Sequence, residues 1–175
     1  MLTCGEDLGM IPACVPQTMN EEQILALEIE RMPKQYGVTF GNPEVYPYLS
    51  VAATSTHDMS TIRGWWREDR SLTQRYWNEV LHQSGQAEKE CKAKTAQMIL
   101  EREMRSGSML AILPLQDWLA MDEKLRLADP DAERINVPAD PNHYWRYRMH
   151  LSLEQLLREE EFNHKVEELV KLRER

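Results

Sequence analysis

Short apolar runs alternate along this chain with longer stretches that have helical periodicity. Residues 1–4, 49–54 and 109–113 are apolar or β-branched runs that predict strands or strand ends. Residues 24–29 predict a buried strand, with a helix as a competing interpretation because the run is short. Helices are expected between these runs, at residues 15–19, 62–66, 72–81, 87–104 and 116–127. The alternation predicts a parallel α/β sheet of about three strands.

Turn-forming and capping residues mark the boundaries of these elements. Ser60 or Thr61 can cap the helix that begins near residue 62. Residues 33–48 and 129–142 are rich in Pro, Gly or Asp and are expected to be loops. Ser152 and Gln155 form a capping-box pattern ahead of an apolar stripe that predicts a terminal amphipathic helix.

Two acidic motifs follow predicted strands: Cys-Gly-Glu-Asp-Leu-Gly at residues 4–9 and Ser-Thr-His-Asp at residues 55–58. Chemistry in parallel α/β sheets takes place at the carboxyl ends of the strands. We therefore expect Glu6 and Asp58 at the exits of two neighbouring strands. Two converging carboxylates suggest acid/base or oxocarbenium chemistry on a sugar. Taken alone, Glu6 has the alternative of a surface or capping carboxylate, and Asp58 that of a helix N-cap.

Composition excludes several other function classes. With 175 residues the chain has the size of one domain or of part of a larger one. Its formal net charge of −8 disfavours binding to nucleic acid. No apolar run approaches the roughly 20 residues that span a bilayer, and the first residues lack the pattern of a secretory signal. We expect a cytoplasmic protein with no membrane contact.

The three cysteines are odd in number and contain no Cys-x-x-Cys pair, which favours reduced thiols. A zinc site built from Cys4, Cys14 and His57 would lack the usual short ligand spacing. We therefore expect no metal site.

Five ordered strings carry a resemblance to a known family: CGEDLGMIPACV, ERMP, YPYLSVAATSTHDMSTIRGWW, LPLQDWL and RINVPADPNHYWRYRMHLSLEQLL. Together they resemble the C-terminal part of the 4-α-glucanotransferases of glycoside hydrolase family 77, the amylomaltases or disproportionating enzymes. The first and last strings are most similar to the larger subgroup that includes the plant cytosolic enzyme. The resemblance implies the C-terminal part of a (β/α)₈ barrel, about three βα units and rich in helix. Residues 1–175 would then be a single, incomplete catalytic domain.

The resemblance also implies roles for individual residues. Glu6 matches the family's acid/base and Asp58 its transition-state stabiliser. His57 matches a residue that hydrogen-bonds the glucose of the donor, and Asn136 matches a further sugar contact. The implied activity is retaining transfer of α-1,4-glucan segments between maltooligosaccharides, with no metal or organic cofactor.

Aromatic platforms would help such a site to exclude water while a covalent intermediate waits for a sugar acceptor. Trp65, Trp66, Tyr144 and Trp145 are candidates, and we include Trp65 among the substrate-binding residues. Helix packing is the alternative for Trp65 and Trp66. Asp117 is expected to buttress the mouth of the barrel.

The chain also departs from the family pattern. The nucleophile of the family lies upstream, in an arginine-x-aspartate motif, and neither Arg31 nor Arg67 replaces it, because these residues lie on other elements. Residues 139–141 replace the usual glycine-threonine loop. We therefore expect the isolated chain to be inactive. The alternative is a non-catalytic fragment that self-associates through exposed barrel edges or binds glucan. A third interpretation, a retaining hydrolase of the α-amylase clan, fits less well, because the C-terminal β-domain of that clan has no counterpart here.

Overall fold

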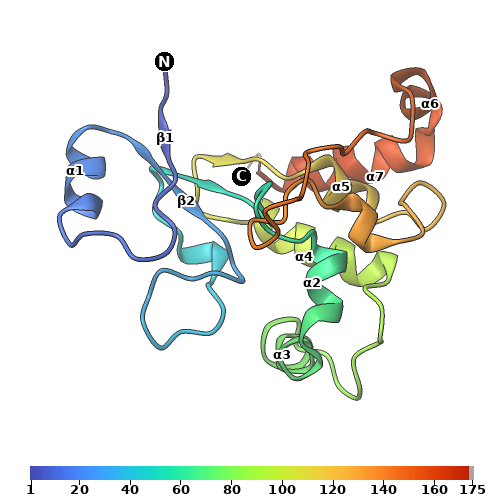
Figure 1. The fold of residues 1–175 in the computed structure, drawn as a ribbon, viewed down its shortest axis with the longest axis horizontal. Coiled ribbons are helices and arrows are strands. Elements are labelled where there is room, and N and C mark those ends of the chain that lie inside the picture. Colours follow the sequence, from blue (N-terminus) through green and yellow to red (C-terminus); the bar gives the residue numbers. More distant parts are fainter. Residues whose placement is uncertain (174–175) are drawn as a thin grey trace.

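The computed structural model describes residues 1–173, and a four-stranded parallel sheet organises them (Figure 1). The strands are β1 (Cys4–Gly5), β2 (Leu25–Glu28), β3 (Ser50–Ala52) and β4 (Leu110–Ala111). They lie in the order β1-β2-β3-β4, and each neighbouring pair is parallel. Because all four run in the same direction, their carboxyl ends meet at one edge of the sheet. The predicted α/β class is confirmed.

The described chain also contains seven α-helices. They are α1 (Val15–Glu21), α2 (Ile62–Glu68), α3 (Arg70–Arg75), α4 (Ala93–Met104), α5 (Leu115–Leu119), α6 (Leu153–Arg158) and α7 (Glu160–Val170). A π-helix, Tyr76–Val80, continues α3, and short 3-10 helices cover Pro43–Val45, Pro130–Glu133 and Lys171–Arg173. Figure 1 shows β1, β2 and α1 at one end of the molecule and the remaining helices gathered at the other.

Helix α1 packs closely on β1 because Gly5 has no side chain. A Cβ atom at this position would lie 2.9 Å from Cε of Met19 on α1 and 3.4 Å from Cγ2 of Ile24. Gly5 is in register with Ala26, so the two share one face of the sheet. Small residues on both strands thus leave room for α1 on this face.

The hydrophobic core lies under α2, α3, α4, α5 and α7. Trp66 is fully buried, and its ring makes edge-to-face contacts with Trp65, Tyr76 and Trp77. Such contacts between aromatic rings add to the stabilisation from burying their apolar area. The terminal helix α7 contributes Phe162 and Leu169 to the same core. The expected packing of an amphipathic terminal helix on the body is therefore confirmed.

A buried polar cluster joins the end of β2 to the π-helix and to α4. Glu30 lies just beyond β2 and accepts hydrogen bonds from Nε and Nη2 of Arg102, at 2.9 and 2.6 Å, and from the hydroxyl of Tyr76. Glu103, the next residue on α4, is 1% exposed. Its Oε2 atom has no hydrogen-bond partner in the described chain. Burial raises the pKa of Glu103 well above its usual value, and the neighbouring Glu30 carboxylate raises it further.

Several element boundaries differ from the expectations. Residues 25–28 form the predicted buried strand and not the competing helix, and the sheet has four strands rather than about three. The capping box at Ser152 and Gln155 is present, and Thr61 caps α2 by accepting a hydrogen bond from the Gly64 amide. Asp58 is therefore not the N-cap. The terminal helix is broken into α6 and α7 at Glu159.

The helix expected over residues 87–104 begins only at Ala93. Side chains from elsewhere in the fold donate to the backbone carbonyl groups that a longer helix would use. Trp66 Nε1 donates to the Glu88 carbonyl at 2.9 Å, and Arg70 donates to the carbonyls of Ala87 and Glu88, both at 2.8 Å. These tertiary contacts hold residues 87–92 in an irregular conformation.

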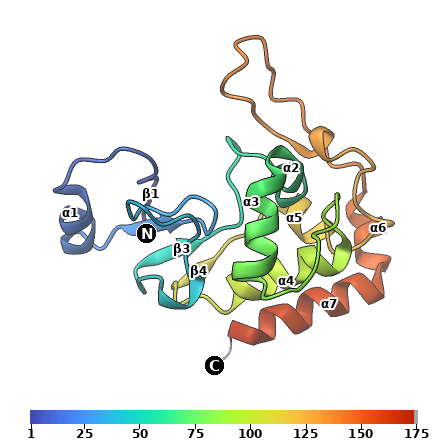
Figure 2. The ribbon, with the colours of Figure 1, turned by 90° about the horizontal axis from the view of Figure 1, so that it is seen from below.

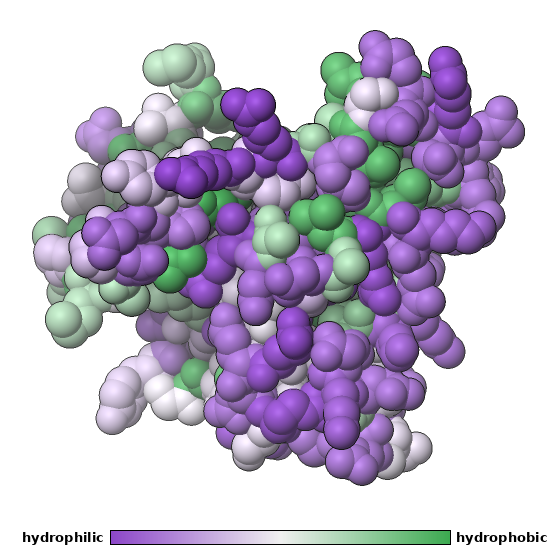
Figure 3. All heavy atoms as spheres, turned by 45° about the vertical axis from the view of Figure 1, so that its right-hand side comes forward, coloured by the Kyte–Doolittle hydropathy of each residue, from purple (hydrophilic) through white to green (hydrophobic). Residues whose placement is uncertain are grey.

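Figure 3 shows apolar and polar side chains mixed over the face that carries α6 and α7. Leu153 and Leu157 are exposed there. None of the helices within residues 1–173 has the length and apolar composition of a membrane-spanning segment. All three cysteines are free, and only Cys91 is buried.

The raised pKa of Glu103 predicts a pH dependence of stability. The carboxyl ionises near pH 4.5 in the unfolded chain and at a higher pH in the folded one, so between these two pKa values folding stability falls as pH rises. Glu103→Gln removes the contribution of this carboxyl to the pH dependence. We expect the variant to gain stability over the wild type with rising pH, by up to about 1.4 kcal/mol per pH unit. Urea unfolding at pH 5, 6, 7 and 8 measures the difference.

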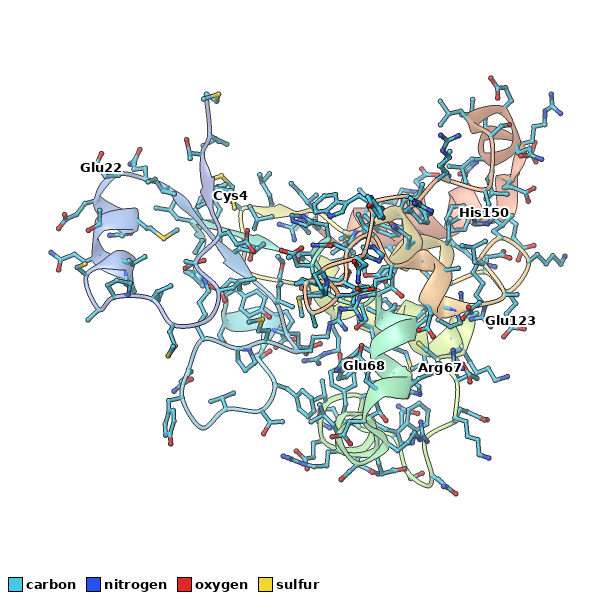
Figure 4. The ribbon with its side chains drawn as sticks, in the orientation of Figure 1. Cys4, Glu22, Arg67, Glu68, Glu123 and His150 are labelled. Carbon is cyan, nitrogen blue, oxygen red and sulfur yellow. The ribbon has the colours of Figure 1, made fainter. Side chains whose placement is uncertain are left out.

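Glu22→Gln is the matched control, because Glu22 is exposed beside α1 (Figure 4). Its unfolding free energy should follow that of the wild type at every pH. The role assigned to Glu103 would be contradicted if the unfolding free energies of Glu103→Gln and the wild type changed with pH in the same way.

Candidate active site

Glu6 and Asp7 follow β1 directly, and the structure gives them opposite environments. Glu6 is exposed, whereas Asp7 is buried. Asp7 accepts a hydrogen bond from the Leu27 amide at 3.0 Å and pairs with Nζ of Lys34 at 2.7 Å. Lys34 also pairs with Glu28 at the end of β2, at 2.9 Å. These contacts tie the turn after β1 to β2 and hold Glu6 at the strand exit.

His57 and Asp58 lie in the loop between β3 and α2. Nδ2 of Asn136 donates to Oδ1 of Asp58 at 2.5 Å, and the Asn136 amide donates to the His57 carbonyl at 3.0 Å. Nε2 of His57 is 3.5 Å from Oδ2 of Asp58. The side chains of His57 and Asp58 are 47% and 40% exposed, so both are open to a ligand. The structure therefore brings three of the predicted site residues together.

An exposed aromatic ring stands beside this group. The ring centroid of Trp145 is 4.9 Å from that of His57, and Trp145 is 60% exposed. Trp145 belongs to the loop that follows Glu133, which projects from the body in Figure 2. In the same loop the guanidinium carbon of Arg146 lies 4.9 Å from the ring centroid of Tyr144, which is a cation–π contact.

A buried carboxylate supports the loop that carries Asp58. Asp117 on α5 is fully buried and accepts hydrogen bonds from Thr54 Oγ1 at 2.5 Å, Ser55 Oγ at 2.9 Å and the Ile62 amide at 2.9 Å. Burial raises the pKa of Asp117, although these hydrogen bonds partly offset the effect. Asp117 thus joins the end of β3 to the start of α2.

A buried ion pair joins α2 to the segment that precedes Asn136. Arg63 Nη1 pairs with Oε1 of Glu133, and the Thr61 hydroxyl donates to Oε2 of the same carboxylate at 3.1 Å. Gln116 donates to the Glu133 carbonyl at 3.2 Å. Glu133 therefore links α2, α5 and the segment that leads to Asn136.

Glu6 and Asp58 lie at the same edge of the sheet, but their strands are not neighbours. β2 separates β1 from β3, so the expectation of neighbouring strands is wrong. The cause is the short run at residues 25–28, which forms a full strand between the two motifs. The strand ends that precede the two carboxylates are therefore about 10 Å apart.

Trp65 lies in the core rather than beside these residues. It is 8% exposed, and its ring packs edge-to-face against Phe40 and Tyr76. The substrate contact expected at Trp65 does not fit this placement. Its helical spacing with Ile62 and Trp66 is the pattern of a buried helix face, which is the alternative that the sequence left open.

Sequence patterns assign no part in the site to Arg31. This residue follows β2, and its guanidinium group donates to the loop between β3 and α2. Its position just past a buried strand was the available signal.

Within residues 1–173, no group of three or more His, Cys, Asp or Glu side chains is arranged to hold a metal ion.

A family model described as 4-alpha-glucanotransferase matches residues 1–153. The chain belongs to this family. One relative is 4-alpha-glucanotransferase DPE2 of Oryza sativa subsp. japonica, 41% identical over 170 residues, which are 97% of this chain and 18% of the relative. Another is the 4-alpha-glucanotransferase of Chlamydia pneumoniae, 32% identical over 173 residues, 97% of this chain and 32% of that protein.

Solved structures of amylomaltases share the fold. The amylomaltase from Streptococcus agalactiae in complex with acarbose superposes with a TM-score of 0.72 at 19% identity, covering 98% of this chain and 32% of that one. The amylomaltase from Corynebacterium glutamicum superposes with a TM-score of 0.66 at 16% identity, covering 97% of this chain and 28% of that one. The chain thus has the fold of part of an amylomaltase barrel and spans less than a third of these proteins.

The contacts of Asp117 predict a large effect of its removal. Asp117→Ala would leave two hydroxyl groups and one amide without their buried acceptor, and each such loss costs about 1–3 kcal/mol. We expect a loss of at least about 3 kcal/mol in the free energy of unfolding. Asp131→Ala, at an exposed position, should change it by less than about 0.5 kcal/mol. Equal effects of the two substitutions in urea unfolding would refute the role of Asp117.

Proposed function

We propose that this chain supplies the acid/base and the stabilising carboxylate of a 4-alpha-glucanotransferase that moves α-1,4-glucan segments with retention of configuration. The observation that carries the proposal is the group formed by Asp58, Asn136 and His57 at the carboxyl edge of the sheet on which Glu6 also lies. The match of residues 1–153 to the family supports it.

Glu6 acts as the acid/base in this proposal. Retaining transfer needs a group that protonates the leaving oxygen and later takes a proton from the incoming hydroxyl. Glu6 is exposed at the exit of β1, whereas Asp7 beside it is neutralised by Lys34 and buried. Of the two adjacent carboxylates, only Glu6 is free to reach a sugar.

Asp58 stabilises the positive charge that develops on the sugar ring in the transition state. Asn136 holds one oxygen of this carboxylate, which fixes its orientation. His57 and the side-chain amide of Asn136 offer hydrogen-bond donors for ring hydroxyl groups. The exposed ring of Trp145, rather than that of buried Trp65, serves as the aromatic platform.

An α-linked glucan is the proposed substrate, in line with the acarbose complex of the Streptococcus agalactiae amylomaltase. The remaining strands of such a barrel would pair with β1 and β4, which are the edge strands of the described sheet. The nucleophile would come from those strands, because no residue of this chain matches it. The proposed mechanism uses no metal or organic cofactor.

A segment exchange tests the function directly. This chain replaces the matching segment of the Oryza sativa relative, and transfer from maltose or maltotriose is measured. We expect an active chimera in which Glu6→Gln and Asp58→Asn each lower kcat/KM by at least about 10²-fold. Glu22→Gln and Asp131→Asn, both exposed, should leave it unchanged. A folded chimera without activity, or one that tolerates Asp58→Asn, would contradict the proposal.

The 175-residue chain alone should not catalyse transfer, because the covalent step has no nucleophile. Loss of a nucleophile removes several powers of ten in rate. Maltotriose incubated with the purified chain should yield no glucose or longer oligosaccharides above a protein-free control. Disproportionation that Glu6→Gln abolishes would show instead that the chain contains a complete site.

A further inference from the structure

One side chain holds both ends of the loop that carries His57 and Asp58. Nε of Arg31 donates to the Thr54 carbonyl at 3.1 Å, at the start of the loop. Nη2 of the same guanidinium donates to the Ser60 carbonyl at its end, and Nη1 is 3.4 Å from Oγ of Ser60. One planar group thus bridges residues 55–59, and Asp58 lies among them.

Arg31 is committed to this loop by its surroundings. It is partly buried just past β2, and its guanidinium carbon lies 5.6 Å from the ring centroid of Trp65. Burial lowers the pKa of Arg31, and the charge of Asp117 opposes the effect. Within the described chain no carboxylate pairs with its nitrogen atoms, so its hydrogen bonds go to the loop.

Asp117 restrains the same loop through different atoms. Thr54 donates its hydroxyl to Asp117 while its carbonyl accepts from Arg31. At the far end, the Ile62 amide donates to Asp117 and the Ser60 carbonyl accepts from Arg31. Each end of the loop is therefore held by one anion and one cation, and the position of Asp58 follows from both.

We propose that Arg31 is a positioning residue that fixes the loop of residues 54–60, and through it the Asp58 carboxylate, for glucan transfer. The proposal rests on the proposed function for its catalytic consequence. A planar guanidinium reaches two carbonyl groups at once, whereas the single ammonium of lysine is a point donor. Small displacements of a catalytic group lower the rate strongly, by about 10²-fold for 1 Å.

The first experiment measures kinetics in the chimera with the Oryza sativa relative. Arg31→Met should lower kcat by about 10²-fold and change KM by less than about threefold, because Asp58 acts on the transition state. Arg31→Lys should restore part of the loss. Arg67→Met is the matched control: Arg67, labelled on α2 in Figure 4, is 42% exposed and should leave kcat unchanged.

A double-mutant cycle separates positioning from general damage to the fold. In an Asp58→Asn background, Arg31→Met should have little further effect on kcat, because it acts through the carboxylate that is already lost. If the loss of kcat in the double variant equalled the product of the losses in the two single variants, the proposal would be overturned. So would an Arg31→Met variant with the kcat of the unmodified chimera.

The second experiment does not depend on activity. The backbone amide of Asn136 donates to the His57 carbonyl in the restrained loop, so its hydrogen exchange in the 175-residue chain reports on loop opening. Arg31→Lys should accelerate this exchange by about tenfold or more, relative to the Ala96 amide of α4. If Arg31→Lys left the exchange rate of the Asn136 amide unchanged, the proposal would be overturned regardless of the kinetic results. If the unmodified chimera were inactive, only the proposed function would be contradicted.

Discussion

The contacts of Asp117 are the constraint on which the site depends. A fully buried carboxylate is unfavourable unless hydrogen bonds compensate for its lost hydration. Here the donors are two hydroxyl groups at the end of β3 and the first amide of α2. The fold can bury this group only when strand, loop and helix are all in place, so the geometry of the loop is coupled to the formation of the core.

Patterns in the sequence were sufficient for the elements that local chemistry determines. The parallel sheet, the cap at Thr61 and the capping box at Ser152 all follow from short-range signals. The start of α4 does not, because distant side chains such as Trp66 and Arg70 hold the carbonyl groups of residues 87 and 88. The break at Glu159 likewise has no distinct signal in the apolar stripe.

The candidate site was predictable in the same uneven way. Asn136 lies against the motif at residues 55–58, and the resemblance implied sugar contacts for both His57 and Asn136. Trp65 fails as a surface platform, because a pair of tryptophans on one helix cannot be assigned to core or surface until the elements that pack against the helix are known. Arg31 was missed because its two closest acceptors are the backbone carbonyl groups of Thr54 and Ser60, and any residue type at those positions would provide them.

The strand between the two motifs has a consequence for how this protein can vary. β2 is hydrogen-bonded to β1 on one side and to β3 on the other, so main-chain pairing sets the span between the exits of those strands. Side chains of β2 can therefore be exchanged without altering that span, as long as the strand itself persists. Insertion or deletion of a single residue in β2 would shift the register of its pairing and displace the exit of β1, with Glu6, relative to the exit of β3, with Asp58.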